Sequence, residues 1–169
     1  PSSLPQSQQQ HHLDVAHLLA LLKEGGPLAQ RFPGYEPRPQ QSQMLEGVAQ
    51  ALQNRHHLIV EGGTGIGKTV AYLLPAIHLA LANNTRVVVS TNTINLQEQL
   101  MHKDIPALLE SLKEESGLDL SRFRHGVLKG KANYLCLRRW AYLTSGEALT
   151  ALEARGLART LVWLQNTQT

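Results

Sequence analysis

The sequence is poor in the residues on which several classes of protein depend. It contains a single cysteine among 169 residues, which excludes a framework of intramolecular disulfides and cannot hold a metal ion alone. No apolar run approaches the roughly 18 residues that a membrane-spanning helix needs, so a membrane span is excluded. The chain begins with proline and lacks a charged-then-apolar leader. We therefore expect a cytoplasmic protein in a reducing setting, and a piece of a longer chain.

Acidic residues are missing from one stretch of the chain. Between Leu120 and Gly146 there is no Asp or Glu, whereas Lys and Arg recur. The net charge is only +3, so this local excess of positive charge points to a polyanionic partner more strongly than the overall charge does. Hydrophobic residues make up 42% and charged residues 17%, a balance that argues for a buried core and against global disorder.

Apolar residues recur at helical spacing over several stretches. Asp14 is placed to cap a helix that begins at Val15, and Pro39 suits the first turn of a helix over 39–54. Further helices are predicted over about 67–82, from Thr93 with a break at Pro106, and over 147–165. Residues 1–13 are rich in Gln, Ser and Pro and predict a disordered linker.

Three short runs predict strands, and the first two of them are expected to be buried. They comprise residues 58–60, 87–89 and 123–128, and the first two consist of Leu, Ile and Val only. Strands that alternate with helices predict an α/β fold, in which a parallel sheet has right-handed crossovers and helices on both faces.

The strongest motif is a glycine-rich loop between the first predicted strand and the next helix. It fits the pattern G-x-x-x-x-G-K-[ST]. Its residues are Gly62, Gly63, Thr64, Gly65, Ile66, Gly67, Lys68 and Thr69.

The residue types of this loop suit a nucleoside triphosphate. Glycines allow successive backbone N–H groups to face the phosphates. The N-terminus of the following helix, which is the positive end of its dipole, also faces the phosphates. Lys68 can reach the β- and γ-phosphates, and the Thr69 hydroxyl can bind Mg²⁺. The alternative is a chance glycine-rich turn, which the flanking strand and helix patterns disfavour. The motif predicts nucleotide binding, but it does not specify the base or the reaction.

Polar segments flank the loop on both sides. Gln41 lies about one helix upstream, and its amide could read the adenine edge, although a solvated helix residue is the plainer interpretation. The second predicted strand is followed by hydroxyl and amide side chains that could contact a sugar–phosphate backbone. An ordinary helix cap at Thr93 is the alternative. These side chains are Ser90, Thr91, Asn92, Thr93 and Gln97.

A basic segment with interleaved aromatic residues follows at residues 128–140. This combination is typical of single-stranded nucleic-acid binding. The residues that could contact nucleic acid are Lys129, Lys131, Tyr134, Arg138 and Arg139. Cys136 lies among them, and a lone cysteine is most often a buried small hydrophobe.

Taken in order, the motifs resemble those of the DinG/XPD group of superfamily 2 helicases, and most closely its bacterial DinG branch. The matching patterns are R-P-x-Q-x-x-M, E-G-G-T-G-x-G-K-T, S-T-x-T-x-x-L-Q-x-Q-L and K-G-x-x-N-Y-L-C. The resemblance implies a RecA-like, ATP-dependent helicase that moves 5′ to 3′ on single-stranded or forked DNA and serves DNA repair. It places Arg38 and Gln41 in an adenine-contacting motif, gives Lys68 and Thr69 catalytic roles, and sets residues 90–100 against DNA.

The resemblance also implies a domain arrangement. Residues 14–130 would be the N-terminal part of the first motor domain, and residues 131–169 the start of an iron–sulfur domain. Cys136 would be the first ligand of a [4Fe–4S] cluster, and some members of the family carry an exonuclease domain ahead of the helicase.

The sequence departs from the family pattern in two respects. A cluster takes four ligands, normally thiolates, and only one cysteine is present. No D-E-x-H box follows the loop, and the motifs of a second motor domain are missing. We therefore expect an incomplete parallel sheet and negligible ATP hydrolysis by this chain alone.

Two other functions fit part of the pattern. The chain could be another P-loop NTPase, such as a small nucleotide kinase, although no substrate lid is recognisable after Thr69. It could also be a non-catalytic module that binds nucleotide and nucleic acid, although an intact loop argues against a purely structural role.

Overall fold

The computed structural model describes residues 11–32, 34–113, 118–145 and 149–167. The chain divides into two units, which meet in the sequence between Val127 and Leu128. The described residues up to Val127 are called the N-terminal unit, and those from Leu128 the C-terminal unit.

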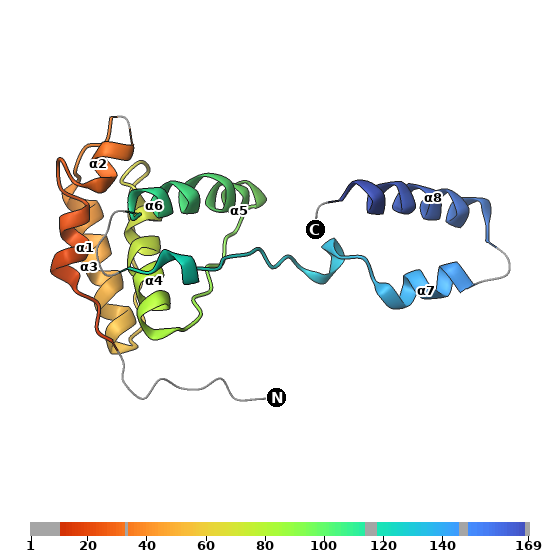
Figure 1. Ribbon diagram of the computed structural model, residues 1–169, viewed down its shortest axis with the longest axis horizontal. Coiled ribbons are helices and arrows are strands. Elements are labelled where there is room, and N and C mark those ends of the chain that lie inside the picture. Colours follow the sequence, from red (N-terminus) through yellow and green to blue (C-terminus); the bar gives the residue numbers. More distant parts are fainter. Residues whose placement is uncertain (1–10, 33, 114–117, 146–148, 168–169) are drawn as a thin grey trace. The chain divides into compact units, whose positions relative to one another are not determined.

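The N-terminal unit is made of helices joined by extended and turning chain. Figure 1 shows α3 and α4 packed side by side. Helices α5, η1 and α6 follow one another without a gap. The bounds are α1 Val15–Leu21, α2 Pro27–Arg31, α3 Pro39–Asn54, α4 Lys68–Asn83, α5 Ile94–Gln99, η1 Leu100–Asp104, α6 Ile105–Ser111 and η2 Leu120–Arg122.

The beginnings of these helices follow from local chemistry. The Asp14 carboxylate accepts a hydrogen bond from the His17 N–H at 2.9 Å and caps α1. Pro39 occupies the first turn of α3, where a missing N–H costs nothing. Thr93 caps α5 by accepting from the Leu96 N–H at 3.2 Å. The predicted caps at Asp14 and Thr93, and the helix over 39–54, are confirmed.

Pro106 does not interrupt the helix in the way that the sequence predicts. A π-helical turn, η1, leads directly into α6, and the Ile105 N–H bonds the Leu100 carbonyl. Pro106 then falls at the N-terminus of α6, where no helical partner is needed for its nitrogen.

Leucine dominates the core of the N-terminal unit. Residues from α1, α2, α3, α4 and α6 meet there, together with residues of the segments between them. The most deeply buried leucines are Leu18, Leu22, Leu28, Leu45, Leu74, Leu108 and Leu112.

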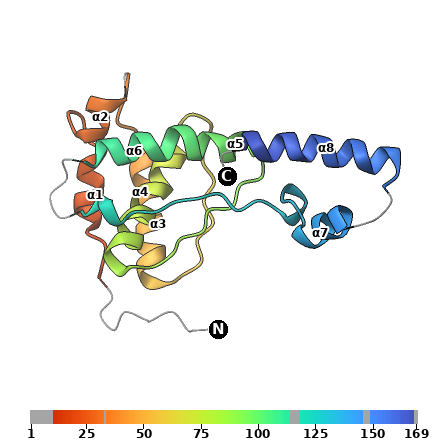
Figure 2. The ribbon, with the colours of Figure 1, turned by 45° about the vertical axis from the view of Figure 1, so that its right-hand side comes forward.

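The expected parallel sheet is wrong for the residues that the structure describes. Among them there is no strand, and Figure 2 shows extended chain at residues 58–60 and 87–89, each of which was expected to form a strand. Residues 123–128 are likewise unpaired. The side chains at the middle of the first two runs are exposed, Ile59 by 99% and Val88 by 89%. A β-branched run becomes a strand only when a neighbour supplies ladder hydrogen bonds, and none is supplied here.

The C-terminal unit consists of two helices and a short 3₁₀ turn. The turn η3 spans Lys131–Asn133, α7 spans Leu137–Ser145 and α8 spans Ala151–Asn166. Helix α8 confirms most of the helix expected over 147–165, of which residues 147 and 148 lie outside the described part. Helix α7 was not predicted. Neither helix contains a buried residue.

The N-terminal arm is described only from His11 onward, so most of the linker predicted over residues 1–13 lies outside the described part. The Asn83 side chain accepts from the His11 N–H at 2.8 Å and donates to its carbonyl at 3.1 Å. Leu13 is buried in the core. None of the described helices is both long and apolar enough to span a membrane.

Candidate phosphate-binding site

The glycine-rich loop runs from Gly62 into the first turn of α4. Gly65 and Gly67 have left-handed backbones, with φ of 81° and 79°. Gly67 is the N-cap of α4 and has no side chain with which to bond the first-turn N–H groups. The helix therefore presents backbone donors at the loop, as an anion site requires.

Lys68 lies over the loop. Its ammonium donates to the carbonyls of Gly62 at 2.9 Å and Gly63 at 2.7 Å. The positive charge is thus held next to the backbone that would surround a phosphate. To contact a phosphate, Lys68 would turn away from one or both carbonyls.

Two of the glycines lie against neighbouring side chains. A Cβ on Gly62 would lie 2.6 Å from Ile66 Cδ1, and a Cβ on Gly67 would overlap Gln41 Nε2. Gly63 has no atom within 4 Å of its Cβ position. The close approach at Gly67 shows that the loop is packed against α3.

The first turns of α3 hold the loop through two side chains. Arg38, the N-cap of α3, donates to the Gly65 carbonyl. Gln41 Nε2 donates to the Gly67 carbonyl at 3.1 Å, and Gln41 is only 4% exposed. The structure therefore places both upstream residues that the sequence singled out against the loop.

Tyr35 completes this contact and was given no role by the sequence. Its hydroxyl lies 2.9 Å from the Leu22 carbonyl and 3.1 Å from Gln41 Oε1. Burial raises the pKa of the Tyr35 phenol above its ordinary value, and the nearby charge of Arg38 opposes this shift. No pattern in the sequence indicates this contact, because Leu22 and Tyr35 belong to different turns.

Thr69 lies one residue into α4, where its hydroxyl is hydrogen-bonded to the Tyr72 phenol. Burial raises the pKa of Tyr72, the bond to Thr69 lowers it, and the charge of Asp104 raises it further. Thr69 is half-buried next to the loop. A single hydroxyl beside a phosphate site suits Mg²⁺, which commonly takes few protein ligands and completes its shell with phosphates and water.

The polar segment after the second extended run lies at the start of α5. Ser90, Asn92 and Thr93 are exposed, whereas Thr91 and Gln97 are half-buried. The Thr91 hydroxyl donates to the Thr93 carbonyl at 3.3 Å. The capping function of Thr93 is present, and the exposed groups are accessible to a partner.

The basic segment belongs to the C-terminal unit. Its four cationic side chains are exposed, and Tyr134 is half-exposed with its hydroxyl accepting from the Lys129 N–H at 2.7 Å. The four are Lys129, Lys131, Arg138 and Arg139.

Cys136 is exposed, unlike the buried small hydrophobe that a lone cysteine suggests. In the described part of the chain, no group of three or more His, Cys, Asp or Glu side chains could hold a metal ion. One thiolate does not fit a [4Fe–4S] cluster, which takes four ligands.

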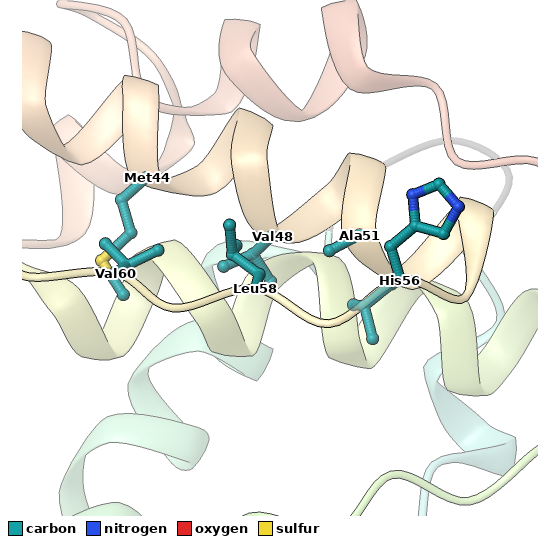
Figure 3. A pocket seen from close by; sticks show the side chains of 7 residues that line it. Met44, Val48, Ala51, His56, Leu58 and Val60 are labelled. Atoms are coloured by element: carbon teal, nitrogen blue, oxygen red, sulfur yellow. The ribbon is translucent and has the colours of Figure 1, made fainter.

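An apolar groove lies between α3 and the extended segment that precedes the loop. Figure 3 shows Met44, Val48 and Ala51 of α3 facing Leu58 and Val60 of that segment. The groove lining lacks the loop residues, and its side chains are apolar apart from His56. It is therefore separate from the phosphate-binding chemistry.

Comparison with known proteins gives a family and several relatives. The DEAD/DEAH box helicase model matches residues 38–134. The chain is 40% identical over 125 residues to the ATP-dependent DNA helicase YoaA of Haemophilus influenzae, covering 74% of this chain and 17% of that protein.

Two further relatives carry the name DinG. The ATP-dependent helicase DinG of Mycobacterium tuberculosis is 46% identical over 99 residues, which is 59% of this chain and 14% of that protein. The 3′-5′ exonuclease DinG of Bacillus subtilis is 36% identical over 144 residues, 84% of this chain and 14% of that protein. The chain thus spans 14–17% of the length of these relatives. No solved structure matches the chain.

Proposed function

This chain belongs to the DEAD/DEAH box helicase family, and from that premise we propose that it carries the ATP-binding part of an ATP-dependent DNA helicase. One observation carries the proposal: the Lys68 ammonium, two left-handed glycines and the uncapped start of α4 converge on a single loop. The cytoplasmic setting expected from the sequence belongs to the same proposal.

In the proposed site the loop binds the phosphates of ATP. Backbone N–H groups of the loop and the first turn of α4 would donate to phosphate oxygens, and Lys68 would neutralise their charge. The Thr69 hydroxyl would hold Mg²⁺, which supplies charge neutralisation between phosphates when bound. The site comprises Arg38, Gln41, Gly62, Gly63, Thr64, Gly65, Ile66, Gly67, Lys68 and Thr69.

We further propose two DNA-contacting surfaces, one in each unit. Hydroxyl and amide groups at the start of α5 suit the sugar–phosphate backbone, with no requirement for a particular base. The exposed cations of the C-terminal unit suit phosphates, and Tyr134 suits base stacking. The first surface comprises Ser90, Thr91, Asn92, Thr93 and Gln97, and the second comprises Lys129, Lys131, Tyr134, Arg138 and Arg139.

The remaining expectations concern the whole protein. Residues 14–130 would belong to the first motor domain and residues 131–169 to the start of an iron–sulfur domain, with movement 5′ to 3′ along DNA. Cys136 could serve a cluster only with three ligands from outside this sequence. The name of the Bacillus subtilis relative supports an exonuclease domain in the parent chain.

Nucleotide binding is tested by isothermal titration calorimetry with MgATP. Lys68→Ala should weaken binding about 10- to 100-fold, because it removes a charge-assisted contact. Lys23→Ala, which changes an exposed lysine outside the site, is the matched control. Hydrolysis by the chain should be negligible. Hydrolysis that Lys68→Ala abolishes would contradict this expectation.

DNA binding is tested by fluorescence anisotropy with a labelled oligo(dT) at several salt concentrations. Replacing both Arg138 and Arg139 by Ala should reduce the slope of log K against log salt by about 0.7 for each phosphate that is no longer neutralised. The control replaces Arg155 and Arg159 of α8, exposed cations of the same unit. Equal effects in the two double variants would show that charge alone is recognised.

A further inference from the structure

Residues 11–13, which are the described part of the N-terminal arm, lie against the ends of α3 and α4. The Asn83 side chain accepts from the His11 N–H at 2.8 Å and donates to the His11 carbonyl at 3.1 Å. Gln53 Nε2 donates to the Leu13 carbonyl at 3.0 Å. Gln53 lies in the last turn of α3, and Asn83 is the last residue of α4. The arm therefore joins the ends of two helices that both begin beside the phosphate loop.

The hydrogen bonds at His11 and Leu13 are made to the backbone of the arm. A backbone N–H can only donate and a carbonyl can only accept, so the Asn83 amide is held in one orientation by the two groups of His11. Paired residues of an antiparallel sheet exchange two hydrogen bonds in the same way. Gln53 bonds the Leu13 carbonyl and also lies 3.4 Å from His12 Nδ1. The His11 side chain is exposed, so its identity should not matter for these contacts.

Leu13 supplies the apolar part of the contact. Its side chain is 7% exposed and belongs to the leucine-rich core. The next residue, Asp14, caps α1, so the arm ends where α1 begins. Helix α1 has seven residues, fewer than the roughly 12–15 that an isolated helix needs to be stable in water. Its stability therefore depends on the core contacts of Leu18 and Leu21 and on the arm that places its cap.

We propose that Gln53 and Asn83 form a docking site for the N-terminal arm, and that the docked arm and α1 open and close as one unit while α3 and α4 stay folded. A helix of 16 residues is about 24 Å long, so this docking site and the phosphate loop lie at opposite ends of α3 and α4. The inference is therefore independent of the proposed function. The arm acts as a strap, and its release would uncover the part of α3 that α1 covers.

The experiment follows hydrogen exchange in the full chain by mass spectrometry. The reporter is a peptide covering residues 14–21, which contains α1 and none of the substituted residues. Asn83→Ala removes two hydrogen bonds and should speed exchange of this peptide about 5- to 100-fold, whereas Gln53→Ala removes one and should speed it about 2- to 10-fold. Alanine is a better helix former than asparagine, so peptides from α4 should exchange no faster in Asn83→Ala.

Two changes at His11 test whether the backbone is what the site recognises. His11→Pro removes the N–H that Asn83 accepts and leaves α3 and α4 unaltered, so exchange of α1 should become about 2- to 10-fold faster. His11→Ala keeps that N–H and should exchange as the unaltered chain does. Equal acceleration by the two changes would overturn recognition through the backbone.

Matched controls are available on the same helices. Asn54 is the last residue of α3, as Asn83 is of α4, and it is exposed. Gln50 is an exposed glutamine of α3, about one turn before Gln53. Asn54→Ala and Gln50→Ala should both leave the exchange of residues 14–21 unchanged.

The outcomes address the two parts of the proposal separately. Unchanged exchange of α1 in Asn83→Ala, or an equal acceleration in Asn54→Ala, would overturn the docking site. Equal acceleration of peptides from α1, α3 and α4 would overturn the separate opening of the arm and α1. If Asn83→Ala does not fold, His11→Pro decides the matter, because it changes the arm alone.

Discussion

Helices α3, α4 and α8 have the same length of 16 residues, yet they are stabilised in different ways. Helices α3 and α4 pack on one another and bury leucine and alanine side chains. Helix α8 buries none of its residues and relies on a capping box, in which Thr150 and Glu153 satisfy each other's backbone N–H groups. Helical spacing of apolar residues thus predicts a helix but not what covers it.

This difference bears on function, because the candidate phosphate site lies in the unit that has a core. Gln41 is held between the loop and Tyr35, whereas Arg138 and Arg139 are exposed on a short helix. A rigid support suits a loop whose N–H groups must point at phosphates. Exposed cations, by contrast, are sufficient to bind the negatively charged backbone of DNA.

Removal of a core leucine should give the largest difference between the units. Leu45 of α3 is fully buried, so Leu45→Ala should lower the free energy of unfolding by about 2–5 kcal/mol. Leu152→Ala in α8 is the control, because Leu152 is 81% exposed and its loss should cost under about 0.5 kcal/mol. Urea unfolding followed by circular dichroism measures both. Equal losses would contradict the description of the two units.

Glycine-to-alanine changes in the loop should have the next largest effect. Gly67→Ala combines a left-handed backbone with overlap on Gln41, Gly65→Ala has the backbone strain alone, and Gly63→Ala has neither. Left-handed backbone costs an L-residue about 1–2 kcal/mol, so the destabilisation should decrease in the order Gly67, Gly65, Gly63. Thermal unfolding of the three variants tests this order. A Gly63→Ala loss as large as that of Gly67→Ala would contradict it.

A glycine-to-alanine change in the C-terminal unit should have the opposite effect on stability. Gly156 lies inside α8, and its Cβ position has no atom within 4 Å. Gly156→Ala should therefore stabilise α8 by about 1 kcal/mol, because alanine loses less backbone entropy in a helix. Hydrogen exchange of peptides from α8 should become slower, while that of α3 and α4 stays unchanged. Faster exchange in α8 would indicate a contact that the structure does not contain.

Acid should weaken the N-terminal cap of α8, and this is the smallest of the four effects that we predict. Hydrogen bonds from the Thr150 N–H and hydroxyl lower the pKa of Glu153 below its ordinary 4.5. The lowered pKa means that the stabilisation is present above the ordinary value and is lost as pH falls through the value in the folded chain. Backbone chemical shifts of Glu153 and Ala154 should report this loss.

Glu153→Gln is the control for the acid effect. Glutamine keeps an acceptor at the same position but does not titrate, so the shifts should no longer change with pH in that window. If the Glu153→Gln variant still showed the pH-dependent change in chemical shift, another group would be responsible for that change.

Several features of the fold were predictable because they depend on neighbouring residues. The Asp14 and Thr93 caps, Pro39 at the start of α3 and the loop that leads into α4 are of this kind. Helix α7 was not predicted, although Leu137, Trp140 and Ala141 recur at helical spacing.

The predicted strands were wrong for a related reason. Residues 58–60 and 87–89 have the composition of buried strands, but a strand also needs a partner whose position the run itself does not specify. In the candidate site, the loop and Lys68 were evident from spacing, and the placement of Arg38 and Gln41 beside them could be expected only through resemblance. Tyr35 was not foreseen, because its contacts are non-local.

The sequence by itself determined where α1, α3 and α5 begin and where the glycine-rich loop meets α4, because these choices are made by groups a few positions apart. The tertiary structure alone decided which helices acquire a core, which extended runs stay unpaired and which carbonyl Gln41 meets. Those outcomes depend on groups brought together by packing, such as Gln41 and Gly67 across 26 positions. No local propensity encodes such an encounter.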